Sequence, residues 1–520
     1  MKDPVGEAAF LARYVSSWRQ DNLAPSEFAG NSDIVMSVSV VNRAAERIAH
    51  DALHFPASSP STTVLSETDR VILQDLGQAR RKIAVLVKIH FIKFSLPDLQ
   101  ANMPKDAGLV AFFPECTRSQ VTEELSNCFD LVIYYDNSTV VYNDLIRCVQ
   151  QVKIPPLSVF LNELVQLVPR EKIALIHSEE ASTLEISRER ERLGLQGAQL
   201  NDVMPLYRKE IVAEIADQNG IATPRTVFAD FSRPQNKQTL LAEIVKKIRN
   251  FPMFAKPSMM LGTVGTSVIA SEKELDAWID DRSADRDSSG YVVQEYIVGR
   301  EFYVVTVLLA DGSWVPLALK YLATVGNHES FYSGKPMISV VERFENAEKG
   351  EFPNIREFTA KVIGAYRPVH PQMFCIQGFQ RKARSSDYVL CELSYRPVGA
   401  PTHKTMYESC GLNQHVAMIL AHVDPNYYPR PPAEWKPRIQ CSIWYHHKEG
   451  VLNSHNPLPS KPHISGTVEA DWKQSPGTKL PSACRSCHVT VTLVLESASD
   501  EERERDAKWI SENWQPDMRK

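Results

Sequence analysis

Two carboxylates and an amide are set into a largely apolar stretch, YVVQEYIVGREFYVV, at residues 291–305. Aromatic and β-branched residues dominate the stretch, so it reads as a strand, a short turn at 298–300 and a second strand. Gln294, Glu295 and Glu301 lie within or beside these strands. A buried carboxylate without a partner is costly. We therefore expect a polar ligand or a compensating charge to meet these three side chains.

A lysine followed by a glycine-containing loop makes a second chemical pattern. Lys256 lies near the end of FPMFAKP (251–257), which reads as a strand, and Gly262 and Gly265 lie in the loop MMLGTVGT that follows. Backbone N–H groups of such a loop can approach a polyphosphate, and the lysine supplies a positive charge for phosphate oxygens. Taken alone, this pattern is more typical of an ordinary strand exit.

Four motifs occur in one order over about 200 residues: NDVMPLYRKEIVAEIADQNGIATPRT, FAKPSMMLGTVGTSV, QEYIVGREF and CELSYRPVGA. This order resembles the ATP-grasp superfamily, whose ligases activate a carboxylate with ATP and pass it to an amine, a thiol or a similar nucleophile. The resemblance covers roughly residues 80–425. The E-x-x-x-R-x-x-G form of ELSYRPVG, with the long segment after it, makes the chain most similar to the amino-acid ligases that make dipeptides, the carnosine synthase branch included.

The resemblance implies that Lys209 and Lys256 hold the nucleotide phosphates from two sides. The loop with Gly262 and Gly265 would be a flexible cover over them. The alternative for the two lysines is structural: Lys209 would be an exposed helix residue and Lys256 an ordinary strand-end residue.

The same resemblance implies that the stretch 291–305 binds the adenine and the ribose of ATP. Backbone groups around Glu295 and Ile297 would pair with the adenine edge, and Gln294 would face the exocyclic amine. Glu301 would accept hydrogen bonds from the ribose hydroxyls. A salt-bridged edge strand is the alternative, and it applies mainly to Glu295.

The metal site implied by the resemblance has only one carboxylate. Glu392 matches one acidic ligand, Ser394 stands at the position of an Asn, and Gln380 aligns best with the second acid, with Gln377 as an alternative register. Mg²⁺ prefers oxygen ligands and shares its coordination with phosphates. We expect ATP and Mg²⁺, with Mn²⁺ as an alternative, and a weaker metal site than one with two acids. Arg396, two residues beyond Ser394, would contact the transferred phosphate.

The reaction implied is phosphorylation of a carboxylate to an acyl phosphate with release of ADP, followed by attack of an amine. Lys256 and Arg396 would be the catalytic residues because they neutralise the charge that develops. Two alternatives stay open: an ATP-binding protein without turnover, and a ligase that uses a thiol or hydroxyl acceptor or a non-amino-acid carboxylate.

Bulk properties exclude several classes of partner. The 520 residues carry a net charge of -5 and no block of basic residues, so we expect small-molecule substrates and no nucleic acid. The start, MKDPVGEAAFLARYVSSW, has Asp3 and Glu7 where a signal peptide would be basic and then apolar, so we expect no signal peptide, and no apolar run reaches the roughly 18 residues of a membrane span. We expect a cytoplasmic protein with reduced cysteines and no membrane partner, and a homodimer stays open. The CRSCH pattern at 484–488 is more often accidental than a haem or zinc site.

These residues require elements to position them, and the sequence suggests four regions. Residues 1–78 form an N-terminal extension with helices and a Ser/Pro-rich linker. Apolar runs at 82–89, 108–113, 129–135 and 171–177, with helices such as 142–152 between them, predict a Rossmann-like parallel sheet over 79–200. Residues 201–425 would form the two ATP-grasp lobes, and 426–520 a strand-rich C-terminal subdomain. The fold class is therefore a multidomain combination of α/β and α+β.

Overall fold

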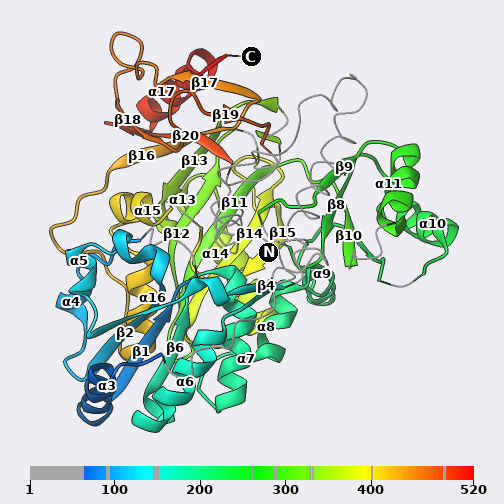
Figure 1. Ribbon diagram of the computed structural model, residues 1–520. Helices are drawn as coiled ribbons and strands as arrows, with labels where there is room; N and C mark the ends of the chain where they lie inside the picture. The colour runs from blue at the N-terminus through cyan, green and yellow to red at the C-terminus, as the bar shows by residue number, and fades with distance from the viewer. Residues whose placement is uncertain are drawn as a thin grey trace.

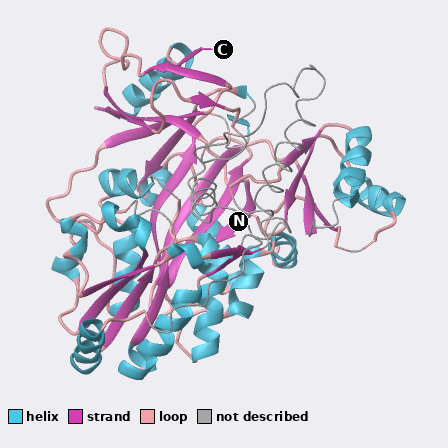
Figure 2. Cartoon of the chain, in the orientation of Figure 1, coloured by secondary structure: helices cyan, strands magenta, loops and turns pink. Residues whose placement is uncertain are grey.

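Three sheets organise the part of the chain that the structure describes (Figure 1). The computed structural model describes residues 64–89, 94–143, 151–232, 234–260, 262–284, 290–324, 326, 329–330, 333–399, 402–483 and 488–519. Most of the predicted extension and the two cysteines of CRSCH therefore lie outside the described residues. Helices gather around the first sheet and on one side of the second, whereas the C-terminal part is mainly strand (Figure 2).

The first sheet is parallel, as the apolar runs predict. Its order is β3-β2-β1-β6, and the strands are β1 (Lys82–Val87), β2 (Ala107–Pro114), β3 (Leu131–Tyr135) and β6 (Ile173–His177). Nearly all residues of β1, β2 and β6 are buried, because helices such as α3 (Glu67–Ala79), α6 (Pro155–Leu167) and α7 (Thr183–Leu193) cover them. The Rossmann-like layer is thus confirmed.

The prediction of a helix over 142–152 is wrong at both ends of this range, which are strands. Val141–Asn143 and Gln151–Lys153 instead form an antiparallel pair, β4 and β5, and the residues between them lie outside the described part. Tyr142 pairs with Val152 in this ladder. Its Val and Tyr residues suit a strand, and the pairing outweighs the helical spacing of the apolar residues.

The second sheet is antiparallel and small, in the order β7-β10-β8-β9. Its strands are β7 (Thr226–Asp230), β8 (Met253–Pro257), β9 (Ser267–Ile269) and β10 (Gly290–Glu295). Helices α10 (Lys237–Ile248) and α11 (Glu272–Ala284) pack against it, on the side away from the rest of the molecule (Figure 1). The side chains Leu240, Ile244 and Ile248 of α10 are buried at i, i+4 spacing.

The third sheet has eight strands and crosses the predicted boundary near residue 425. Its order is β15-β14-β11-β12-β13-β16-β20-β18, with β11 (Arg300–Leu308), β12 (Trp314–Leu322), β13 (Met337–Glu342), β14 (Gln372–Gln380), β15 (Tyr388–Ser394), β16 (Ile439–His446), β18 (Thr467–Trp472) and β20 (Val489–Ser497). The strands from the C-terminal region therefore extend the sheet of the region before them. Helix α15 (Thr402–Cys410) contacts β12 and β13, and α16 (Gln414–Val423) contacts both this sheet and the parallel sheet.

Further helices and strands complete the described part of the chain. They are α4 (Leu99–Asn102), α5 (Glu123–Ser126), α8 (Leu200–Tyr207), α9 (Lys209–Gln218), α13 (Phe344–Lys349), α14 (Ile355–Tyr366), α17 (Asp500–Asn513), β17 (Gly450–Ser454), β19 (Lys479–Leu480) and β21 (Asp517–Arg519). None of the helices in the described ranges is long and apolar enough to cross a membrane.

The stretch 291–305 is a connection between two sheets. Its first strand, β10, belongs to the small sheet and its second, β11, to the large one. The two strands therefore do not pair with each other, although each is where the sequence predicts a strand. This connection brings the small sheet to one face of the large sheet, where the predicted site residues gather.

Candidate active site

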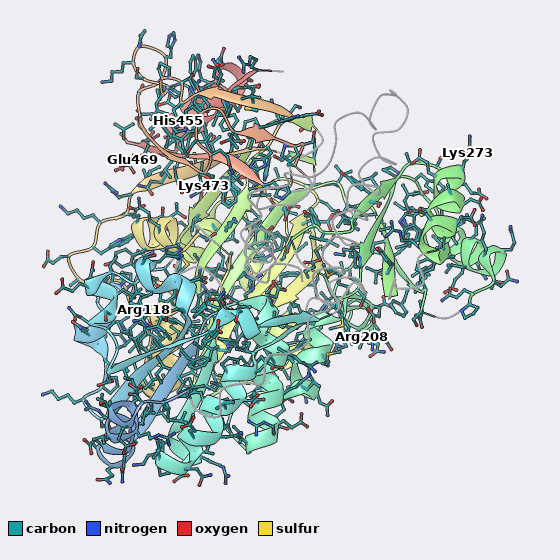
Figure 3. All side chains as sticks on the ribbon, in the orientation of Figure 1. Arg118, Arg208, Lys273, His455, Glu469 and Lys473 are labelled. Atoms are coloured by element: carbon teal, nitrogen blue, oxygen red, sulfur yellow. The ribbon has the colours of Figure 1, made fainter. Side chains whose placement is uncertain are left out.

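A cavity of about 460 Å³ lies between β8 with its following loop and one face of the large sheet. Its size is that of a pocket for a small molecule. The polar side chains that line it are Glu180, Lys209, Lys256, Thr263, Thr266, Glu301, Tyr303, Lys320, Gln377, Glu392, Ser394 and Arg396. By contrast, labelled charged residues such as Lys273 on α11 and Glu469 on β18 lie at the periphery (Figure 3). The cavity therefore collects the majority of the predicted site residues.

Two lysines converge on Glu392 within the cavity. The Nζ of Lys256, on β8, donates to Oε1 of Glu392 at 2.9 Å, and the Nζ of Lys209 lies 3.8 Å from the same oxygen. Lys209 begins α9 and also donates to the carbonyl of Met260 at 2.8 Å. Side chains of three separate segments thus form one charged cluster.

Burial and charge act in opposite directions on this cluster. Burial alone would raise the pKa of Glu392, but Lys256 and Lys209 outweigh it and hold the pKa at about 2. Burial lowers the pKa of Lys209, whereas for Lys256 the effect of burial is outweighed by Cys391 and Glu392, so its pKa is raised. Glu392 and Lys256 are therefore charged at neutral pH, and the cavity contains preorganised positive charge.

Arg396 also lines the cavity, as its spacing from Ser394 predicts. Its guanidinium is paired with the carboxylate of Glu180, which comes from the segment after β6, and donates to the carbonyl of Pro397 at 2.6 Å. Although burial lowers the pKa of Arg396, Glu180 raises it more. The parallel sheet thus contributes a carboxylate to the cavity, next to the arginine.

The structure places Gln377, not Gln380, at the cavity. Gln380 is 1% exposed, and its amide donates to the carbonyls of Glu351 at 2.7 Å and Ser385 at 2.9 Å. Gln377 lines the cavity and lies opposite Glu392 in the ladder of β14 and β15. Alternate residues of a strand face opposite sides, so two glutamines three positions apart cannot both face the cavity. The register with Gln377 therefore replaces the one with Gln380.

A bulge in the β14–β15 ladder adds a cysteine to the site. The pairing shifts between Gln377 and Gly378, which leaves Cys391 as the extra residue on β15. The thiol of Cys391 lies 3.6 Å from the Nζ of Lys256, and burial raises the pKa of this thiol to about 11. Both Cys391 and Glu392 line the cavity as a result.

Of the residues predicted for the nucleoside, Glu301 lines the cavity and the other side chains do not. Glu301 accepts from Gln377 at 2.8 Å and from the hydroxyl of Tyr303. Gln294 is buried and donates to the hydroxyl of Thr226 at 2.9 Å, and Ile297 is half-buried. Glu295 forms an ion pair with Arg225 at 3.0 Å, which is the alternative that the sequence left open for this residue.

The loop after β8 needs both of its predicted glycines. Gly262 and Gly265 have φ values of 62° and 72°, in the left-handed region that other residues rarely adopt. Gly262 lines the cavity. A Cβ on Gly265 would lie 2.8 Å from Cγ of Pro257, so this glycine lets the loop pack against the end of β8.

Sequence reasoning missed several cavity residues, among them Glu180, Tyr303, Lys320, Cys391 and Trp444. Lys320 and Tyr303 are opposite each other on β12 and β11, and Trp444 is on β16 of the C-terminal region. The alternation of β11 could have identified Tyr303, which is two residues after Glu301. Trp444 had no such signal, because its position depends on pairing between strands about 100 residues apart.

The oxygen donors in the cavity fit a magnesium ion that is also held by phosphate. Glu392, Ser394 and Gln377 offer a carboxylate, a hydroxyl and an amide oxygen on two neighbouring strands. Mg²⁺ keeps several water or phosphate ligands and is often bound by only one or two carboxylates. No group of three His, Cys, Asp or Glu residues able to hold a metal occurs in the described part of the chain.

Known structures are similar to this chain in fold. An L-amino acid ligase from Bacillus licheniformis superposes with a TM-score of 0.56 at 14% identity, over 85% of this chain and 100% of that one. The biotin carboxylase domain of Hydrogenobacter thermophilus 2-oxoglutarate carboxylase, in complex with MgADP, ADP and bicarbonate, gives 0.53 at 13%, over 84% and 91%. An N5-carboxyaminoimidazole synthetase from Staphylococcus aureus, complexed with ADP, gives 0.51 at 13%, over 83% and 97%.

These similar structures are ATP-grasp enzymes, so the chain has the ATP-grasp fold. No protein-family model and no curated protein sequence matches the chain. At 13–14% identity the similarity concerns the fold alone. Any activity therefore has to be argued from the cavity.

Proposed function

We propose that the protein is an ATP-dependent ligase that condenses a carboxylate, that of an amino acid, with an amine and releases ADP and phosphate. The observation that carries this proposal is the convergence of Lys209, Lys256, Glu392 and Arg396 in one cavity between the small and the large sheet. Fixed positive charge in a cavity away from bulk water stabilises the charge that develops during phosphoryl transfer. The ATP-grasp fold, which is shared with an L-amino acid ligase, supports the same reaction class.

In the first step, a carboxylate oxygen of the donor substrate attacks the γ-phosphorus of ATP. The bond from phosphorus to the β–γ bridging oxygen breaks, and ADP leaves with the bond electrons. Lys256 and Lys209 bind the phosphate oxygens, and Arg396, whose paired donors are held by Glu180, supplies positive charge beside the transferred group. Mg²⁺, which Glu392, Gln377 and Ser394 would hold, supplies neutralisation of phosphate charge.

In the second step, the amine attacks the carbonyl carbon of the acyl phosphate. The C–N bond forms, the C–O bond to phosphate breaks, and the amine loses a proton to the departing phosphate or to water. The chain's part in this step is positioning and the exclusion of water, which would otherwise hydrolyse the acyl phosphate. Glu301, whose carboxylate lines the cavity, would hold the ribose hydroxyls during both steps.

Transfer of an oxygen isotope tests the first step directly. The purified protein is incubated with ATP, Mg²⁺ and pooled amino acids whose carboxylates carry ¹⁸O, and the phosphate released is analysed by mass spectrometry. The proposal predicts ADP, a condensed product and one ¹⁸O atom in the phosphate. The products AMP and pyrophosphate would contradict the acyl-phosphate route, and Glu392→Gln is the control that should abolish the transfer.

An ATP-binding protein without turnover is a second candidate, because Gln377 and Ser394 are neutral where acids would hold metal more strongly. Calorimetry that finds tight ATP binding, together with no ADP release at high Mg²⁺ across a wide range of carboxylates and amines, would favour it. A ligase with a thiol or hydroxyl acceptor would instead release ADP and form an ester or thioester, which mass spectrometry separates from an amide. We further propose a homodimer, which light scattering tests.

A further inference from the structure

Two residues at and after the end of β6 hold the bend that carries Arg396. Strand β15 ends at Ser394, and Tyr395 and Arg396 form the bend that follows. His177, the last residue of β6, bonds through Nε2 to the carbonyl oxygen of Tyr395 at 3.1 Å. Glu180, three residues later, is ion-paired with Arg396. Two consecutive residues of the bend are therefore fixed by residues 218 and 216 positions earlier in the chain.

His177 is fully buried and neutral. Its exposed fraction is 0%, and burial together with the charge of Arg190 lowers its pKa well below the ordinary value. A carbonyl oxygen only accepts hydrogen bonds, so Nε2 of His177 carries the proton and donates it. The other ring nitrogen, Nδ1, has no hydrogen-bond partner among the described residues. An apolar side chain would avoid the burial of this atom, so the bond to the Tyr395 carbonyl is what the imidazole adds.

The pairing with Glu180 leaves part of the Arg396 guanidinium available. A guanidinium has five N–H donors in one plane. Nε and one terminal nitrogen donate to Glu180, and the other terminal nitrogen donates to the carbonyl of Pro397. One N–H on each terminal nitrogen therefore has no partner in the described ranges. Because Arg396 lines the cavity, these two donors can meet a transferred phosphoryl group.

The segment after Arg396 is held as well. The side chain of Gln414, at the start of α16, exchanges two hydrogen bonds with the backbone of Val398, each at 2.8 Å. The bend is thus restrained on both sides of Arg396, and Glu180 restrains the side chain itself. A free arginine side chain loses up to about 2 kcal/mol of conformational entropy when it is held in one geometry. Here the geometry is set before any substrate binds.

We propose that His177 and Glu180 are positioning residues for phosphoryl transfer, which act by holding Arg396 at the cavity. The inference rests on the ligase function proposed above and gives the parallel sheet a part in its chemistry. Charge and position predict opposite effects at Glu180. If only charge mattered, loss of this carboxylate would strengthen the attraction of Arg396 for phosphate and raise the rate. If position matters more, the same change lowers the rate, since a displacement of about 1 Å can reduce a rate roughly 100-fold.

The test measures kcat and KM for ADP release in single and double variants, with the amino acids that the wild type accepts. His177→Leu and Glu180→Gln should each lower kcat by about tenfold or more and leave the KM for ATP within about twofold. His177→Gln, whose amide can donate in place of Nε2, should recover most of the loss. In an Arg396→Gln background both changes should have little effect on kcat, because residues that act through one group are not additive.

His422→Leu is the matched control. His422 is a half-buried histidine on α16, and its Nδ1 bonds to the carbonyl of Met418 in the same helix instead of the bend. This substitution should lower the Tm and leave kcat unchanged. A comparison of Tm and kcat across all variants therefore separates a loss of stability from a loss of positioning.

Three outcomes would overturn the inference. An unchanged or higher kcat in Glu180→Gln would mean that this carboxylate only offsets charge. Equal effects of His177→Leu with and without Arg396 would give His177 a purely structural role and leave the ligase function intact. Absence of ADP release by the wild type with every donor would instead remove the ligase function, and this inference with it. If His177→Leu does not fold, Glu180→Gln in the two backgrounds still decides.

Discussion

Adding a carboxylate at Gln377 should lower the magnesium requirement of the enzyme. Gln377 lies opposite Glu392 in the ladder and lines the cavity, so Gln377→Glu places a second carboxylate at the proposed metal site. A carboxylate about 4 Å from a divalent cation gains about 2 kcal/mol even at the dielectric constant of water, and more in a partly enclosed cavity. Lys256 and Lys209 already attract carboxylates in this cavity and so offset part of any larger gain in the free energy of metal binding. We therefore expect the lower value. It corresponds to about a 30-fold lower half-saturating Mg²⁺ concentration.

Gln380→Glu is the matched control. Its side chain is buried on the opposite face of the sheet and donates to two backbone carbonyls, while its own oxygen accepts from Arg300 at 2.6 Å. The substitution replaces both donors with a carboxylate oxygen that faces those carbonyls, which should cost roughly 2–5 kcal/mol of stability. The control should therefore lower the Tm and leave the magnesium requirement unchanged.

The assay is a magnesium titration of ADP release at fixed free ATP for the wild type and the two variants. A magnesium-dependent shift of the Tm in the presence of ADP gives a second readout that does not depend on turnover. A variant Gln377→Glu with an unchanged half-saturating concentration in both experiments would refute the metal assignment. A lower requirement in Gln380→Glu alone would mean that the strand register in solution differs from the one described here.

Three further substitutions test the remaining assignments. Lys256→Met should weaken ATP binding and reduce turnover by about 2–4 kcal/mol, the effect of losing one preorganised charge; ADP release and calorimetry measure this, with Lys237→Met, at a half-buried ion pair away from the cavity, as control. Glu301→Gln should raise the KM for ATP more than it lowers kcat, since ribose contacts are equal in ground and transition states, and a pure rate effect would contradict the assignment. Glu392 has a lowered pKa of about 2, so the stability it contributes is present above its ordinary pKa of 4.5 and is lost as the pH falls towards 2. The difference in unfolding free energy between wild type and Glu392→Gln, measured with urea from pH 6 to pH 3, should therefore shrink on acidification; a constant difference would argue against the lysine pairing.

The strands, and several residues that line the cavity, could be predicted because their signals are local. Continuous apolar runs such as 82–89 and 108–113 are typical of strands that are buried on both faces, and the structure has a parallel sheet there. Lys256 could be assigned to the end of a strand because Pro257 and the glycines after it are strong breakers. Glu392 and Ser394 lie two residues apart on β15, so the alternation of the strand brings both to one face, whereas Arg396 follows in the bend after the strand.

Residues whose environment depends on distant segments could not be predicted in the same way. Glu295 is paired with Arg225, which is 70 residues earlier in the chain, so its ion pair has no local signal. The register between β14 and β15 shifts at a bulge. The extra residue in this bulge is Cys391, and a cysteine, unlike Gly or Pro, does not indicate a bulge in the sequence. Gln380 and Gln377 are three positions apart and therefore face opposite sides of their strand. Strand alternation, applied strictly to β11 and β14, would have favoured Gln377 as the glutamine on the same face as Glu301.

The neutral residues in the proposed metal site are consistent with the charges around it. Glu392 already balances the charge of Lys256 and part of that of Lys209. The side-chain amide of Gln377 donates to the carboxylate of Glu301 at 2.8 Å, so a carboxylate at position 377 would lie beside that of Glu301. Without bound nucleotide, two carboxylates at hydrogen-bond distance would share a proton or repel each other, because like charges cannot both ionise at that separation. The amide instead donates to Glu301 and keeps its oxygen free for a cation. A neutral ligand at position 377 therefore avoids repulsion between carboxylates when no metal is bound, but it lowers the affinity for the metal. The magnesium titration of Gln377→Glu measures this difference in affinity directly.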